Sequence, residues 1–438
     1  MTYNEVLEYI KEKEKIGSVF GLDSIHELLK RLGNPENGIP AIHIAGTNGK
    51  GSILSYVEEV LVEAGLKVGR YISPTIFDYR ERWRLNKEWA SEEDVALAVT
   101  EVSKTVSEMT EDGLNSPTAF EIETAAMFIL FRNWNVDVML VECGMGGLLD
   151  ATNVIEDNVI NVMASVSMDH MQILGDTVQK ITEQKLGIVR PGTTLVSYPQ
   201  TEEARDVIRE YASSNDVRLI ESSISESDII EDRYDGSRFI YKGREFRLSI
   251  GGSYQILNAI TAIDVLDAFY DEFIMDGSIC SMDRDEFSDH MIQGLEKTVW
   301  DGRFSIYGND PVIVVDGAHN RDAWINLKTS LENYFTNEKF VYIIGVLRDK
   351  EYNRMVELLS PTAECVICVE SENPRALGAD ELKAAFNEAG VRAESYKTSY
   401  GKALVRAMEM AEKRDEVVVI CGTLSITGEM IRCIESTK

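Results

Sequence analysis

Basic residues are scarce in this 438-residue chain: 44 Lys and Arg stand against 74 Asp and Glu, which gives a formal charge of −30. This charge excludes nucleic acids and anionic membranes as the main partner, although a local positive site can still bind an anionic small molecule. The chain also lacks an apolar run long enough to span a membrane. Its amino-terminal stretch, MTYNEVLEYIKEKEKIG, is charged and amphipathic, unlike a signal peptide or an anchor. We therefore expect a cytoplasmic protein.

Cysteine is rare as well, with six in the whole chain. So few in a protein expected in the cytoplasm indicate reduced thiols rather than a disulfide framework. Cys365 and Cys368 form a C-x-x-C pattern inside AECVICVE, and no second cysteine pair lies nearby. A redox or zinc role is the alternative for this pair, but its apolar, β-branched flanks favour a buried strand.

The sequence alternates between strand-like and helix-like segments, which predicts an α/β fold with a mostly parallel sheet. The chain is too long for one hydrophobic core, so we expect two domains. The boundary is expected near 294–298. Residues 1–296 are predicted to form a larger nucleotide-binding domain with a phosphate-binding loop, and residues 297–438 a smaller Rossmann-like domain.

Several local elements are specific enough to test. Residues 51–64, 118–134 and 254–269 read as helices, and Ser91 with Asp94 three residues later resembles the start of another. Residues 238–250, RFIYKGREFRLSI, alternate about Lys242-Gly243 and predict a hairpin.

The stretch AIHIAGTNGKGS joins an apolar strand to a helix through a loop with little side-chain bulk. Glycines allow several backbone N–H groups to point at one anion, and the following helix terminus adds partial positive charge. We therefore expect this loop to hold the phosphates of a nucleotide, with Lys50 reaching the outer ones. The alternative is a tight turn with a surface lysine. Ser52 comes one place later than the usual metal-binding hydroxyl, because Gly51 intervenes. The loop residues are Gly46, Thr47, Asn48, Gly49, Lys50, Gly51 and Ser52.

Two neighbouring strands carry polar residues at their carboxyl ends, the edge where an open α/β sheet binds ligands. Glu142 ends VDVMLVE, and Asp169-His170 follows VINVMASVS. A carboxylate beside phosphates suits Mg²⁺. The alternatives are a buried glutamate paired with a base, and a structural histidine.

Further stretches occur in a fixed order along the chain: HIAGTNGKGS, YISPTIFDYRERWRLN, VECGMGGLLDATN, MDHMQILGDTVQKITEQKLGIVRPG, GGSYQILNAITAI, WDGRF, VVDGAHN, GVLRDKEY, NPRAL and VVICGTLSITGE. In this order the chain resembles folylpolyglutamate synthases and bifunctional dihydrofolate/folylpolyglutamate synthases, which belong to the Mur ligase superfamily. The glycine loop alone indicates only the superfamily. The segment around Lys185 together with DGAHN points to the folate branch.

The resemblance implies an ATP-dependent ligase. In similar enzymes ATP phosphorylates the terminal carboxylate of a folate, and the amine of L-glutamate then attacks the acyl phosphate. It implies two Mg²⁺ ions, with Ser73, Glu142 and His170 as ligands and with Glu142 bridging. Lys185 matches the lysine that carries CO₂ as a carbamate in this family, which requires a depressed pKa at that amine.

The resemblance also assigns nucleotide contacts. Gln255 and Asn258 match a helix start whose asparagine faces the nucleotide. Arg303, Asp316 and His319 are expected to close over ATP from the second domain. The residues expected to carry catalysis are Lys50, Glu142, His170, Lys185 and Arg303.

The chain departs from the family pattern at a few positions: Thr75 for histidine, Leu148 for arginine, Gln184 for glutamate, Arg321 for proline and Thr423 for serine. None of these removes an expected metal ligand. Thr75 and Leu148 leave details of the substrate pocket open. Gln184 leaves open the charge around the carbamate.

The expected substrates are a reduced folate, L-glutamate and ATP, with dihydropteroate as a further candidate. No nucleic acid or membrane partner is expected, and the resemblance implies a monomer. Two other functions stay open: another superfamily ligase acting on a cell-wall nucleotide precursor, and a nucleotide-binding regulator without chemistry.

Overall fold

The computed structural model describes residues 1–17, 21–156, 159–308, 310–335, 339–412 and 416–436. The chain divides into two compact units, Met1–Ile224 with Leu257–Leu295, and Ser225–Ile256 with Glu296–Lys438. The second unit thus has two segments, and the longer one begins at Glu296. The domain bounds expected from the sequence, 1–296 and 297–438, stay a prediction.

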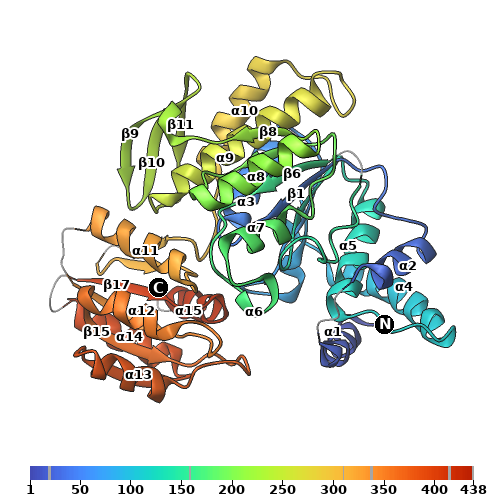
Figure 1. The fold of residues 1–438 in the computed structure, drawn as a ribbon. Helices are drawn as coiled ribbons and strands as arrows, with labels where there is room; N and C mark the ends of the chain where they lie inside the picture. The colour runs from blue at the N-terminus through green and yellow to red at the C-terminus, as the bar shows by residue number, and fades with distance from the viewer. Residues whose placement is uncertain (18–20, 157–158, 309, 336–338, 413–415, 437–438) are drawn as a thin grey trace. The chain divides into compact units, whose positions relative to one another are not determined.

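The first unit is built on a mostly parallel sheet in the order β4-β3-β2-β5-β1-β6-β7-β8 (Figure 1). Its strands are β1 Ala41–Ala45, β2 Val68–Tyr71, β3 Trp83–Leu85, β4 Glu88–Trp89, β5 Val138–Glu142, β6 Val159–Met163, β7 Thr194–Ser197 and β8 Arg218–Glu221. Only the β2–β3 and β3–β4 pairs are antiparallel among these. The central strands are buried along their whole length, as parallel strands covered on both faces are.

Helices cover both faces of this sheet. The helices of the first unit are α1 Tyr3–Lys13, α2 Asp23–Arg31, α3 Lys50–Glu63, α4 Glu92–Glu111, α5 Ala119–Trp134, α6 Met171–Leu174, α7 Val178–Leu186, α8 Glu202–Ser214, α9 Tyr254–Phe269 and α10 Arg284–Lys297. Successive residues of a strand face opposite ways. In β2, a Cβ on Gly69 would meet the ring of Phe131 on α5, whereas Arg70 pairs with Glu58 on α3 at 2.6 Å. Helices α3 and α5 therefore pack on opposite faces.

Two predicted helix starts are confirmed by their caps. The Ser91 side chain accepts a hydrogen bond from the N–H of Asp94. Thr118 and Glu121 form a complete capping box before α5, in which each side chain bonds the other residue's backbone.

The second unit contains a three-stranded antiparallel sheet and a six-stranded sheet in the order β12-β13-β17-β14-β15-β16. Its strands are β9 Ser227–Arg233, β10 Gly236–Tyr241, β11 Arg244–Leu248, β12 Ser305–Tyr307, β13 Ile313–Val315, β14 Phe340–Ile344, β15 Ala363–Val369, β16 Ala393–Lys397 and β17 Val417–Cys421. The predicted hairpin at 238–250 is confirmed as β10 and β11. The helices are α11 Arg321–Tyr334, α12 Tyr352–Leu359, α13 Ala379–Glu388, α14 Tyr400–Glu412 and α15 Leu424–Ser436.

Cys365 and Cys368 lie in β15 and are fully buried, so the strand interpretation of the C-x-x-C pattern is confirmed. Burial raises the pKa of both thiols, to about 11 for Cys365 and about 12 for Cys368. Throughout the described ranges, none of the helices combines the length and the apolar character that a membrane span requires.

Candidate active site

The loop after β1 has a backbone that requires glycine at two points. Gly46 has φ +153°, and a Cβ there would lie 2.6 Å from the Cβ of Ala164. Gly49 has φ +89°, and its Cβ would lie 2.7 Å from Oδ1 of Asn258 on α9. The loop therefore packs directly against the strand end of β6 and against α9, with no room for a side chain at either contact.

Hydrogen bonds hold this loop against the residues that follow β6. The N–H groups of Thr47 and Asn48 donate to the carbonyl of Ser165, at 2.7 and 3.3 Å. The Thr47 hydroxyl accepts from the N–H of Ser167 at 3.1 Å. Helix α3 then starts at Lys50 with Gly49 as its N-cap, which has no side chain to cap it. An uncapped helix start next to a glycine turn is the arrangement that binds phosphate groups.

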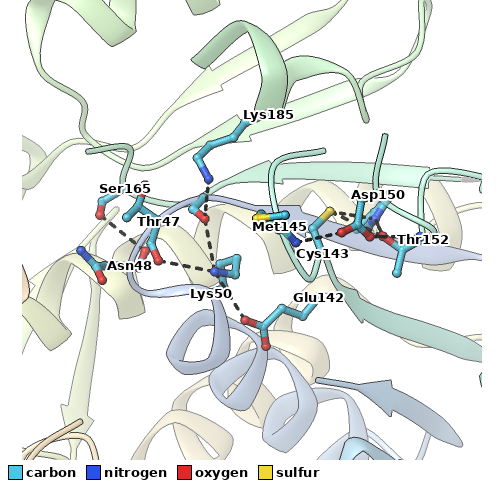
Figure 2. Close-up of polar contacts among 12 residues, drawn as sticks. Thr47, Asn48, Lys50, Glu142, Cys143, Met145, Asp150, Thr152, Ser165 and Lys185 are labelled. Carbon is cyan, nitrogen blue, oxygen red and sulfur yellow. Dashed lines mark hydrogen bonds and ion pairs between the residues drawn. The ribbon is translucent and has the colours of Figure 1, made fainter. Parts of the chain in front are cut away.

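Two lysines meet at one carbonyl of this loop (Figure 2). Lys185 Nζ donates to the carbonyl oxygen of Gly46 at 2.8 Å, and Lys50 Nζ approaches the same oxygen at 3.2 Å. Lys50 Nζ also lies 3.4 Å from the carbonyl of Thr47 and 3.6 Å from Oε1 of Glu142. The structure thus brings together Lys50, Glu142 and Lys185. They lie at the start of α3, the end of β5 and the last turn of α7, respectively.

Lys185 is 3% exposed and lies on the last turn of α7. Burial lowers its pKa to about 7, and the positive charge of Lys50 contributes to the lowering. Near neutral pH a large fraction of this amine is therefore unprotonated, which is the form that can act as a nucleophile.

A glycine-rich loop follows Glu142 and packs against the turn that carries Lys185. A Cβ on Gly147 would lie 2.6 Å from the carbonyl oxygen of Lys185, so this glycine permits the contact. The N–H of Leu148 donates to the carbonyl of Gln184 at 2.8 Å. Two of the departures from the family pattern, Leu148 and Gln184, therefore touch each other through their backbones. The Leu148 side chain is exposed.

The remaining expected metal ligands are Ser73 and His170. Ser73 is half-buried just after β2, and His170 is exposed with φ +50° at the start of α6. The His170 N–H donates to the Asp169 carboxylate at 2.9 Å. The described residues hold no group of three or more His, Cys, Asp or Glu arranged to bind a metal. The expected set contains only two residues of these types, Glu142 and His170, so it stays a prediction.

In the second unit, the DGAHN segment forms a bonded turn after β13. Asp316 is buried and accepts from the Tyr254 hydroxyl at 2.6 Å, from the Phe304 N–H at 2.9 Å and from the Ala318 N–H at 2.8 Å. The Arg303 guanidinium lies over Gly317, where a Cβ would be 2.4 Å from Nη1. His319 Nδ1 is 2.9 Å from the carbonyl of Gly317.

Both oxygens of Asp316 are thus engaged by groups of the second unit itself. These bonds hold the turn that carries Gly317 and His319 in place. Burial raises its pKa, while the Tyr254 hydrogen bond and the charge of Arg303 oppose that rise.

Sequence reasoning missed a buried polar group immediately behind Glu142, made by His43, Cys143, Asp150 and Thr152. The signal in the sequence is a histidine inside the otherwise apolar strand AIHIA. Its partners lie about 100 residues away, so no local pattern identifies them.

A glycine loop with two lysines, set at the carboxyl edge of a parallel sheet and accompanied by a second α/β unit, defines a nucleotide-dependent enzyme of the Mur ligase type. Residues 302–424 match the family model described as "Mur ligase, glutamate ligase domain". The chain is 31% identical over 438 residues to the dihydrofolate synthase/folylpolyglutamate synthase of Bacillus subtilis, covering 98% of both chains. It belongs to this dihydrofolate synthase/folylpolyglutamate synthase family.

Solved structures agree with this assignment. Folylpolyglutamate synthase of Mycobacterium tuberculosis, complexed with ADP, superimposes with a TM-score of 0.86 at 25% identity over 99% of each chain. A bifunctional folylpolyglutamate synthase/dihydrofolate synthase with Mn, AMPPNP and L-glutamate bound gives a TM-score of 0.81 at 26% identity, covering 99% of this chain and 98% of that one.

Proposed function

We propose that this protein is an ATP-dependent ligase that adds L-glutamate to a reduced folate. The observation that carries the proposal is the meeting of Lys50 and Lys185 at the Gly46 carbonyl, beside Glu142. Support comes from family membership and from the relative that was solved with Mn, AMPPNP and L-glutamate.

The proposed reaction has two steps, phosphorylation of the folate carboxylate and formation of the amide bond. An oxygen of the folate carboxylate attacks the γ-phosphorus of ATP, a C–O–P linkage forms, and the bond to the β-phosphate oxygen breaks to release ADP. The unprotonated amine of glutamate then attacks the acyl carbon, the C–N bond forms and inorganic phosphate leaves. The amine loses its remaining extra proton to phosphate or solvent.

The chain's residues contribute mainly position and charge in this scheme, as in phosphoryl transfer generally. The loop of residues 46–52 binds the β- and γ-phosphates, and Lys50 neutralises charge on the group being transferred. In the second unit, Arg303 and His319 are assigned to nucleotide binding, and Asp316 holds their turn in shape. Asn258, which packs on Gly49, keeps the loop against α9.

Mg²⁺ supplies a Lewis acid that shields the phosphate charge when it is bound. The residues of the first unit fit such an ion: Glu142 offers a buried carboxylate at the sheet edge, next to the phosphate loop. We assign Ser73, Glu142, His170 and a carbamate of Lys185 as the ligands of two ions. The carbamate fits the structure because CO₂ adds only to an unprotonated amine, and burial favours that form of Lys185.

The test is glutamate-dependent ADP release, measured side by side with tetrahydrofolate and with dihydropteroate. Turnover with tetrahydrofolate supports the proposal, and turnover with dihydropteroate adds the dihydrofolate synthase activity named for the Bacillus subtilis relative. Turnover only with a cell-wall nucleotide precursor assigns the protein to another branch of the superfamily. ATP binding without turnover on any of these substrates makes it a regulator and rejects the proposal.

A further inference from the structure

A buried chain of polar groups lies directly behind Glu142. His43 Nε2 is 2.8 Å from the Thr152 hydroxyl, and that hydroxyl is 2.6 Å from Oδ1 of Asp150. Cys143 Sγ lies 3.2 Å from the same His43 nitrogen. His43 and Thr152 are fully buried, and Cys143 and Asp150 are at most 6% exposed. Figure 2 shows Cys143, Asp150 and Thr152 gathered beside the end of β5 that carries Glu142.

The direction of the hydrogen bonds in this buried network follows from the number of donors that each group offers. Asp150 also accepts from the N–H groups of Met145 at 2.8 Å and Thr152 at 3.0 Å, so its carboxylate acts as an acceptor. The single hydroxyl hydrogen of Thr152 therefore points to Asp150, and His43 must donate through Nε2. His43 Nδ1 then carries only a lone pair, which agrees with its lack of a hydrogen-bond partner among the described residues.

These buried groups fix the loop that follows one proposed metal ligand, Glu142, and that contacts the turn of another, Lys185. One end of the loop continues from Glu142 through Cys143, whose N–H donates to the carbonyl of Ile44 at 3.0 Å. Its middle rests on the turn that carries Lys185, through the close approach of Gly147 to the Lys185 carbonyl. The Asp150 carboxylate closes the loop by binding the N–H of Met145.

We propose that Thr152 and Asp150 are positioning residues, which together with His43 set the distance between the Glu142 carboxylate and the Lys185 amine. Neither residue needs to touch substrate for this role. The inference rests on the proposed function, because Glu142 and Lys185 are the two metal ligands that this network would position. A half-ångström error in such groups is enough to impair a preorganised site.

The test compares Thr152→Val with Thr152→Ser. Valine keeps the branched shape and removes the hydroxyl, which leaves Asp150 with one donor fewer and the His43 N–H without its acceptor. Serine keeps the hydroxyl. We expect Thr152→Val to lower kcat about tenfold or more and to raise, about tenfold, the Mg²⁺ concentration that half-saturates ADP binding, in line with the effects of orienting partners at metal sites. Thr152→Ser should stay within about threefold of the wild type in both quantities.

The ADP titration by calorimetry needs no folate, so it tests the inference even if folate ligation is absent. A folded Thr152→Val protein with unchanged kcat and unchanged Mg²⁺ dependence overturns the proposal. Equal losses in the valine and serine variants overturn it too, because the hydroxyl is then not the cause. If Thr152→Val does not fold, His43→Phe decides, because it leaves the Thr152–Asp150 bond in place. A raised half-saturating Mg²⁺ concentration for ADP binding supports the proposal, whereas the wild-type value rejects it.

Discussion

Lys185 shows how one side chain can depend on its surroundings for its chemistry. The same residue type four positions from Asp176, Lys180, is exposed, and its ion pair raises its pKa. Lys185 is buried beside Lys50, and its pKa falls to about 7. Two lysines of one short helix therefore differ in protonation because one is withdrawn from water and faces another cation.

Replacing Lys185 with alanine should abolish ligation while nucleotide still binds. The variant removes the amine that the proposed carbamate requires, and loss of one preorganised charged group costs on the order of 10²–10³-fold in kcat. Steady-state ADP release and ADP titration measure the two effects. Lys180→Ala, on the exposed face of the same helix, should keep wild-type activity. Near-normal ligation by Lys185→Ala would remove the carbamate from the mechanism.

At the scale of elements, the phosphate loop depends on how closely α9 approaches it. Gly49 and Gly65 lie at opposite ends of α3 and both have positive φ, +89° and +81°. A Cβ at Gly49 would collide with Asn258, whereas a Cβ at Gly65 would meet nothing within 4 Å. A side chain would strain the backbone at either glycine. Only at Gly49 would it also collide with another helix.

Gly49→Ala should therefore reduce nucleotide affinity at least tenfold, because the loop must shift away from α9 to fit the methyl group. Gly65→Ala should cost about 1 kcal/mol of stability through its left-handed backbone and leave nucleotide affinity unchanged. Calorimetric titration with ADP and thermal unfolding of both variants provide the comparison. Equal affinities in the two variants would contradict the contact with Asn258.

The second unit joins β16 to α14 through Glu394, which accepts two hydrogen bonds from Arg406, both at 3.0 Å. Arg392 donates a third at 2.6 Å. These bonds lower the pKa of Glu394 to about 2, below its ordinary value of 4.5. A depressed carboxylate pKa contributes stability that is present above pH 4.5 and is lost as the pH falls toward 2.

Glu394→Gln should accordingly lower the free energy of unfolding by about 1–2 kcal/mol at pH 7, a value reduced by partial exposure of the pair. The difference from wild type should shrink steadily between pH 4.5 and 3, as seen in urea unfolding at each pH. Glu357→Gln, which breaks an exposed pair with Arg354, serves as the control and should change stability by less than about 0.5 kcal/mol. A difference that stays constant with pH would show that the carboxylate charge is not responsible.

At the scale of the whole molecule, the dominant property is the charge of −30. Self-repulsion among so many acidic groups destabilises the compact state and is weakened by salt within a Debye length of about 10 Å at 0.1 M. The expected outcome is a melting temperature that rises by several degrees between about 10 and 200 mM NaCl. KCl should give the same shift because screening depends on ionic strength alone, and a falling melting temperature would contradict the account.

The sequence by itself determined the local features. Glycine spacing predicted the phosphate loop, Ser91 with Asp94 predicted the start of α4, and alternation predicted the hairpin of β10 and β11. Each of these depends on residues within a few positions of one another, so the information is present in a short window. The resemblance to a known family added the folate ligase interpretation, which full-length relatives confirm at the level of the family.

Only the tertiary structure decided which distant residues share an environment. It brought Lys185 to the Gly46 carbonyl, His43 to Thr152 and Asp150, and the segment Ser225–Ile256 into the second unit. The depressed pKa of Lys185 is a consequence of burial and of a neighbouring charge, and neither exists until the chain is folded. The sequence specifies the residue types at a site, but the distances and the dielectric surroundings that set their chemistry arise from packing between elements far apart in the chain.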